Sequence, residues 1–183
     1  MSFNYELTSE VIQSQAELLV EFHSKYTVYF QTKTRDNSVQ ALEYLKGQLL
    51  LKSKRNMSQM ATEVTDINEQ ALSHFTSNSP WNDGHLTEQI GQDAVALIGP
   101  EGALILDESG CPKQGDKSVG VARQYCGRLG KVDNCQVGVF VAYAKAGQTT
   151  LIDKRLYLPQ EWIDNPQRCR QAGVPEEEIV FRK

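Results

Sequence analysis

The spacing of apolar residues changes at Gly99-Pro100, and this change limits the possible folds more than any other feature of the 183-residue chain. Before it, apolar residues recur every three or four positions, which is typical of amphipathic helices. After it, residues 103–106 form a short, wholly apolar run, typical of a central strand buried on both faces. The order predicts an α+β protein, with a helical region at residues 1–99 and a sheet region at residues 100–183.

Helices are predicted over residues 9–24, 39–49, 58–64 and 83–98, with a further short helix that ends before Pro80. Ser9, Ser38 and Asp66 are the predicted N-caps of three of them, and Asp66 with Glu69 forms a capping-box pattern. The helix at 58–64 and the one after Asp66 have the shape of a helix-turn-helix, with a basic stretch before them. Helix pairs occur in any helical domain, so this spacing is also compatible with a purely structural role.

Strands are predicted over residues 118–125, 136–143 and 149–158, in addition to residues 103–106. The segments 127–134 and 145–147 are predicted to be the turns between them. The sheet region therefore contains three or four strands that follow one another along the chain.

Charge is unevenly distributed on this chain, whose formal net charge is −4. Basic residues gather at 46–55 and again at 113–131, and such local patches are compatible with DNA contact on an acidic protein. A solvated surface is the alternative interpretation of both patches. The four cysteines contain no C-x-x-C pair and lie far from the histidines in sequence, so we expect reduced thiols and no zinc site.

Asp107 is the candidate catalytic residue, because it directly follows the apolar run. A strand holds a carboxylate at its end rigidly, and Mg²⁺ prefers such hard oxygen ligands. Gly110, Pro112 and Gly115 predict that a loop follows. The alternative is that Asp107 is a turn-forming residue at the end of a strand.

The segment LILDESGCPKQGDKSVGVARQYCGRLGKVDNCQVGVFVAYA, followed by TLIDKRLYLPQEW, resembles the start of the catalytic domain of insertion-sequence transposases of the DDE superfamily. KRNMSQMATEV and LSHFTSNSPW are similar to the helical N-terminal region of those proteins. The resemblance extends over roughly residues 35–183. It implies an RNase H-like fold, of which this chain would hold an incomplete sheet of the first three or four strands. It also implies two Asp and one Glu that bind Mg²⁺ or Mn²⁺ for phosphoryl transfer on DNA, with Asp107 as the first Asp.

The contexts of the second Asp and the Glu do not occur in this sequence. Asp133 is expected in a hairpin turn, Asp153 in a strand beside two basic residues, and Asp164 in a loop flanked by proline. The resemblance therefore implies a truncated transposase that keeps DNA binding at most, whereas the complete enzyme would cut transposon ends and transfer strands. The alternatives are a non-catalytic DNA-binding or dimerising regulator of the full transposase, and a plain globular domain.

DNA carrying the terminal inverted repeats of the transposon is the expected partner, together with self-association or association with the full-length transposase. The predicted DNA-binding residues are Lys52, Lys54, Arg55, Lys113, Lys117, Arg123 and Arg128. No run of about 18 apolar residues is present, so we expect no membrane span and a cytoplasmic, nucleoid-associated protein.

Overall fold

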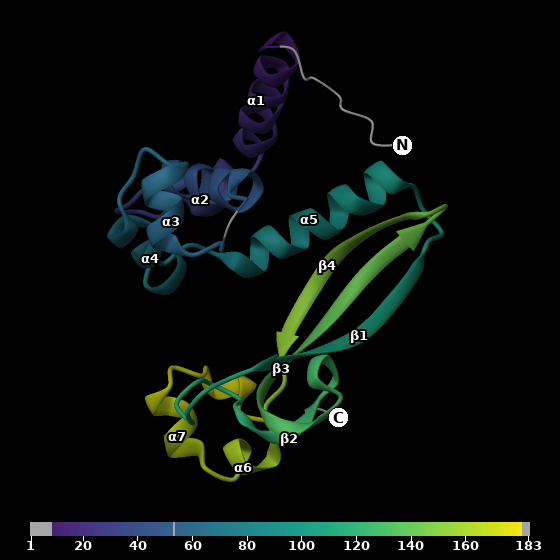
Figure 1. Cartoon of the computed structure of the whole chain (residues 1–183). Coiled ribbons are helices and arrows are strands. Elements are labelled where there is room, and N and C mark those ends of the chain that lie inside the picture. The colour runs from purple at the N-terminus through teal and green to yellow at the C-terminus, as the bar shows by residue number, and fades with distance from the viewer. Residues whose placement is uncertain (1–8, 53, 181–183) are drawn as a thin grey trace. The chain divides into compact units, whose positions relative to one another are not determined.

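A computed structural model describes residues 9–52 and 54–180 of the chain (Figure 1). The chain forms two compact units, a helical unit that ends at Leu86 and a sheet unit that begins at Thr87. The protein is α+β, with helices followed by an antiparallel sheet. In order, the elements are α1 Ser9–Ser24, a 3-10 helix Thr27–Phe30, α2 Ser38–Leu50, α3 Met57–Glu63, α4 Glu69–Ser77, α5 Asp83–Ile98, β1 Ala103–Pro112, β2 Ala122–Cys126, a 3-10 helix Gly127–Leu129, β3 Lys131–Lys145, β4 Gln148–Leu156, α6 Gln160–Ile163, α7 Pro166–Gln171 and a 3-10 helix Glu176–Glu178.

The helical unit is built where the C-terminal end of α2 meets α3 and α4. Leu51, Met60 and Leu72 are each at most 2% exposed and pack together. An aromatic group lies beside this cluster: the ring of Phe30 is 5.9 Å from Phe75 and 5.3 Å from Trp81, centroid to centroid. Burial of these rings and aliphatic side chains is the main force that holds the helices together.

Two predicted N-caps were wrong. Asn68 caps α4, because its Oδ1 accepts from the backbone N–H of Ala71 at 2.9 Å. Asp66 instead donates its backbone N–H to Glu43 Oε2 at 3.1 Å, two residues before the cap. Ser38 is the first residue of α2, and its N–H donates to Asp36 Oδ1 at 2.8 Å. Neighbouring polar residues compete for the same role, and the entry angle of the chain decides which one is used.

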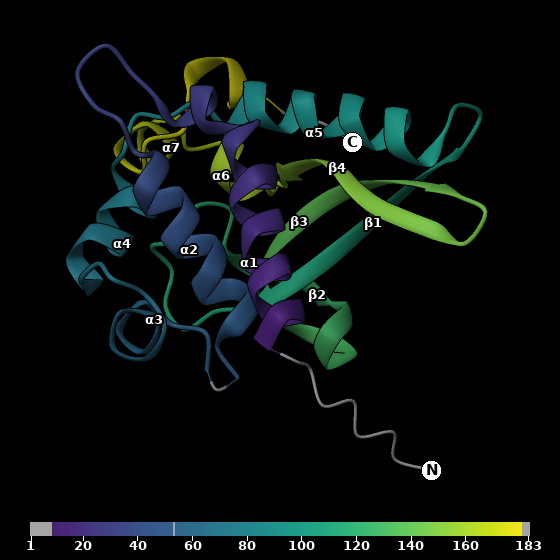
Figure 2. The same ribbon diagram turned by 90° about the horizontal axis from the view of Figure 1, so that it is seen from above.

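The sheet has β3 at its centre. β1 pairs antiparallel along one edge of β3, from Ala103 opposite Ala144 to Pro112 opposite Cys135. β4 pairs with residues 138–145 of β3 and the short β2 with residues 131–135, both antiparallel on the other edge. β1, β3 and β4 extend together away from the end of the sheet unit that carries β2, α6 and α7 (Figures 1 and 2).

The position of β1 differs from the prediction. β1 is an edge strand with an open face, and Leu104 and Leu106 are 69% and 71% exposed. It continues to Pro112, so Gly110 and Pro112 lie in the strand and not in a loop. An apolar run indicates that a strand is suited to burial, but it does not indicate which strands lie next to it.

The boundaries of β2 and β3 also differ from the prediction. Residues 118–121 form a turn, in which Val121 N–H donates to Ser118 O at 3.1 Å, and β2 begins only at Ala122. β3 begins at Lys131, directly after Gly130, whose φ of 64° completes the tight turn. The turn between β2 and β3 is therefore shorter than expected, and Asp133 lies in a strand.

The buried core of the sheet unit lies where β2, α6 and α7 meet. Trp162, Val121, Leu158 and Cys169 form it, and each is at most 9% exposed. The indole Nε1 of Trp162 donates to Val121 O at 2.8 Å, and so ties α6 to the turn that precedes β2. No helix in the described part of the chain is long and apolar enough to cross a membrane.

Gly120 is the glycine with the strictest requirement. Its φ is +72°, and a Cβ atom built on it would lie 2.6 Å from the carbonyl oxygen of Tyr157. Gly120→Ala is therefore expected to lower the free energy of unfolding by about 2–4 kcal/mol, through a positive φ and a clash with backbone. Gly130→Ala is the control, because Gly130 has φ +64° and open space around it, so only the backbone cost of about 1 kcal/mol applies. Equal losses of the two variants in urea unfolding would contradict the clash.

Candidate functional site

Asp107 lies in the middle of β1, with its side chain exposed. It is opposite Phe140 of β3, which in turn is opposite Lys154 of β4. Residues opposite one another in antiparallel strands share a face of the sheet. Asp107 and Lys154 therefore stand on the same face, on either side of Phe140. The Oδ1 atom of Asp107 accepts from the backbone N–H of Glu108 at 2.9 Å.

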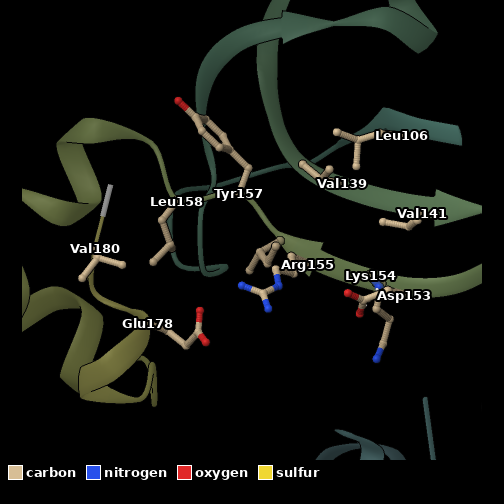
Figure 3. A pocket seen from close by; sticks show the side chains of 11 residues that line it. Leu106, Val139, Val141, Asp153, Lys154, Arg155, Tyr157, Leu158, Glu178 and Val180 are labelled. Carbon is tan, nitrogen blue, oxygen red and sulfur yellow. Dashed lines mark hydrogen bonds between the residues drawn. The ribbon is translucent and has the colours of Figure 1, made fainter. Parts of the chain in front are cut away.

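The opposite face of the sheet carries an apolar cavity of about 410 Å³ (Figure 3). Leu106, Val139 and Val141 line it from β1 and β3. Asp153 and Arg155 of β4 line it as well, as do Leu158 and Val180. Since side chains alternate along a strand, Asp107 faces away from this cavity and Glu108 faces the same side as Leu106. The cavity is therefore not the environment of Asp107.

The other candidate carboxylates do not join Asp107. Asp133 pairs with Lys131 at 2.8 Å, and the hydrogen bond from Lys131 is the largest cause of the lowered pKa of the Asp133 carboxyl. Asp153 is opposite Val141, on the face of the apolar cavity. Asp164 follows α6 and accepts from Gln160 Nε2 at 2.8 Å.

The residues present do not fit a centre for two divalent ions. Among residues 9–52 and 54–180, no group of three or more His, Cys, Asp or Glu side chains is placed to hold a metal ion. Asp107 is a single carboxylate, whereas a pair of ions that clamps a phosphate needs several such ligands. We therefore derive no metal-dependent step from these residues alone.

The predicted DNA-binding residues lie in two places. Lys52, Lys54 and Arg55 are exposed in the segment between α2 and α3, directly after the buried Leu51. The others lie in the sheet unit, around the loop from β1 to β2 and the turn after β2: Lys113, Lys117, Arg123 and Arg128.

Asn134 of β3 lies among the basic residues of the sheet unit and binds the backbone of the loop from β1 to β2. Its Nδ2 donates to Lys113 O at 2.9 Å and to Gly115 O at 2.7 Å. Arg123 is opposite Asn134 in the pairing of β2 with β3, so Arg123 and the backbone of Lys113 flank the same residue. Lys113 is half-buried, whereas Lys117, Arg123 and Arg128 are exposed.

A polar pocket of about 360 Å³ in the helical unit had no counterpart in the sequence-based prediction. Its lining residues are Arg35, Asp36, Asn37, Gln40, Ala71, His74 and Ser79. They come from segments more than thirty positions apart, so no local spacing indicates the pocket. The only signal in the sequence is the polar run QTKTRDNS, which has the composition of a turn.

Residues 26–183 match the family of DDE superfamily endonucleases, and the chain belongs to this family. The chain is also 34% identical over 154 residues to a protein from Microchaete diplosiphon described as a probable transposase for insertion sequence element IS701. This match covers 82% of the chain and 40% of the relative, so the chain spans about two fifths of the relative's length. No solved structure matches the chain. The resemblance to insertion-sequence transposases of the DDE superfamily is thereby confirmed.

Proposed function

We propose that the chain is the N-terminal part of an insertion-sequence transposase, in which Asp107 is one of the catalytic carboxylates. The observation that carries this proposal is the position of Asp107: it is exposed in the middle of the first strand of the sheet. A strand fixes the direction of the side chain, and its exposure leaves the carboxylate accessible to a metal ion.

The sheet supports this assignment. β1, β3 and β4 form three long antiparallel neighbours in the order β1-β3-β4, and β2 is a short addition at the end of β3. We propose that they are the first three strands, and an extra strand, of an RNase H-like sheet. The open edge and the exposed apolar side chains of β1 are what an incomplete sheet of this kind would present.

Asp107 would supply one oxygen ligand for Mg²⁺ or Mn²⁺ in the complete centre. Such ions would polarise the scissile phosphate and activate the attacking oxygen when bound. The contexts in which the resemblance places the second Asp and the Glu do not occur among the 183 residues. The cutting of transposon ends and the transfer of strands therefore belong, in this proposal, to a protein that also contains them.

The 183-residue chain is expected to leave DNA intact when it is incubated with Mg²⁺ or Mn²⁺ and a duplex that carries the terminal inverted repeat. One carboxylate cannot hold two divalent ions next to a phosphate. Denaturing gel electrophoresis measures the cleavage. Asp107→Asn is the control, because nicking that persists in this variant comes from a contaminating nuclease. Nicking by the natural chain that disappears in Asp107→Asn would contradict the expectation.

DNA binding is the activity that we propose for the chain by itself. The exposed cations at Lys52, Lys54 and Arg55 would contact phosphates, and Lys117, Arg123 and Arg128 would guide DNA toward Asp107. A gel-shift titration with terminal inverted-repeat DNA and with a scrambled duplex, at two salt concentrations, tests this proposal. Weak binding that is equal on both duplexes and lost at the higher salt would show that the chain contacts DNA only by electrostatic attraction and does not recognise the inverted repeat.

A regulatory role is the second candidate, and the open edge of β1 is the observation that favours it. The outer edge of this ten-residue strand has no neighbouring strand in the described part of the chain, and such an edge can pair with a strand of another chain. A chain that occupies transposon ends, or associates with the full transposase through this edge, would inhibit transposition without any chemistry. Sedimentation of the chain alone and mixed with the full transposase distinguishes this role from DNA binding by a lone chain.

A further inference from the structure

The polar pocket in the helical unit is held by a chain of hydrogen bonds. Arg35 Nη1 lies 3.4 Å from His74 Nε2, and His74 Nδ1 lies 3.1 Å from Ser79 Oγ. Ser79 Oγ donates to Asn37 Oδ1 at 3.4 Å, and Asn37 Nδ2 donates to Phe30 O at 3.4 Å. Asn37 is buried, so it connects this series of hydrogen bonds to the interior of the helical unit. These hydrogen bonds connect four of the residues that line the pocket and hold their side chains in place.

The direction of these bonds follows from Arg35. A guanidinium has only donors, so His74 Nε2 must be the acceptor and must carry no proton. The proton of the neutral imidazole is then on Nδ1, which donates to Ser79 Oγ. This agrees with the direction of the next bond, in which Ser79 donates to Asn37. In this arrangement His74 Nε2 accepts from Arg35 and is not free to donate to a ligand.

The charge of the pocket depends on His74. Among the described lining residues, Arg35 and Asp36 carry opposite charges, so the lining is neutral when His74 is neutral. Hydrogen bonds from Ser38, and a weaker one from Gln31, hold the pKa of the Asp36 carboxyl below its ordinary value, and Asp36 stays ionised. His23, which interacts with Asp36, is buried, and its burial lowers its pKa and keeps it neutral near pH 7. A proton on His74 Nε2 is therefore the change that makes the pocket positive.

Two further features suit an anion. The loop from Gln31 to Asp36 closes through Thr32, whose backbone N–H donates to Arg35 O at 2.8 Å, and it carries Lys33 beside Arg35. Gln40 lines the pocket, and its buried Oε1 has no hydrogen-bond partner among the described residues. This oxygen is an acceptor, so Gln40 could donate to an anion only after its terminal amide rotates and exchanges Oε1 with Nε2. Unmatched buried polar atoms are uncommon and mark places where a ligand or water completes the bonding.

We propose that this pocket binds a phosphodiester of the DNA backbone, and that His74 takes up a proton when it does so. The phosphate would accept from Arg35 in place of His74, and the released Nε2 would become a second donor to it. A histidine that donates from both ring nitrogens is protonated, so affinity for the phosphodiester would be higher at pH 6 than at pH 8. This inference rests on the proposed DNA binding and adds a site that the basic clusters do not include.

The test combines DNA affinity with the titration of His74. Arg35→Ala and His74→Gln are compared with the natural chain by fluorescence anisotropy on a duplex, at pH 6 and pH 8 and equal ionic strength. We expect Arg35→Ala to bind about tenfold more weakly, as for one charged phosphate contact. We expect His74→Gln to lose the gain in affinity that the natural chain shows at pH 6. Lys25→Ala, which removes an exposed cation on another element, is the matched control and should retain the gain.

A second measurement separates the pocket from DNA binding in general. The pKa of His74 is followed by NMR in the intact chain with and without dimethyl phosphate, a diester whose charge is constant over this pH range. A pKa of His74 that rises with the diester supports the phosphodiester site. If the chain then binds no duplex, that result counts against the proposed DNA binding and not against the pocket. An unchanged pKa, together with natural affinity and pH dependence in both variants, would overturn the proposal and leave DNA binding intact.

Discussion

Trp162→Ala is expected to lower the free energy of unfolding of the sheet unit by about 3–5 kcal/mol, the range for a large aromatic residue removed from a core. Trp162 is 1% exposed and packs with Val121, Leu158 and Cys169. Its removal leaves a cavity and deprives Val121 O of the indole donor at 2.8 Å. Arg168 also loses the ring over which its guanidinium lies, at 3.8 Å from the centroid. Urea unfolding followed by circular dichroism measures the change.

Trp162→Phe is the matched control for this prediction. It keeps an aromatic ring in the core but leaves Val121 O without its donor, which costs about 1–3 kcal/mol for a buried polar group. The difference in the free energy of unfolding between the two variants then measures the contribution of the packing of the ring. A loss below about 1 kcal/mol in Trp162→Ala would mean that α6 does not hold the sheet unit together.

The second large effect is expected in DNA affinity. Replacing Lys52, Lys54 and Arg55 by alanine should weaken binding to any duplex by at least about tenfold at moderate salt, because three phosphate contacts are lost. The slope of log affinity against log salt should fall by about 0.9 for each contact. The loss should be equal for inverted-repeat and scrambled duplexes, since contacts to phosphate carry no sequence information.

The control for this triple variant removes the same charge elsewhere. Lys25, Arg155 and Arg170 are exposed and lie outside both basic clusters, and Arg170 is in a surface ion pair that contributes little to stability. Their replacement by alanine should lower affinity only slightly. If the control weakens binding as much as the cluster does, net charge governs the affinity and the segment between α2 and α3 is not an interface.

Local patterns predicted the helices well. The predicted helices at 9–24 and 83–98 have the bounds of α1 and α5. The helix predicted at 39–49 is one residue shorter than α2 at each end, and the one predicted at 58–64 is shifted by one residue from α3. A helix closes its hydrogen bonds within four residues, so its signal is contained in a short stretch of sequence. The caps at Asp66 and Ser38 were wrong because several polar residues near each helix start can serve.

The strands were predicted less well. Residues 103–106 were expected to form a buried central strand, yet β1 is a ten-residue edge strand with Leu104 and Leu106 exposed. The pairing partner of a strand lies far away in the chain, so a short apolar run cannot distinguish a centre from an edge. Asp133 was expected in a turn and lies in β3, where it pairs with Lys131, because the turn after β2 already ends at Gly130.

The amino-acid sequence was enough to predict the α+β class, the order of helices before strands and the transposase family, and to single out Asp107 as the candidate carboxylate. Each of these depends on residues close together in the chain. The position of Asp107 in mid-strand, on the face away from the apolar cavity, follows instead from the fold. Only the tertiary structure brought Arg35, His74 and Ser79 together around one pocket. Strand register and pocket lining depend on contacts between distant segments, and packing of the whole unit selects those contacts.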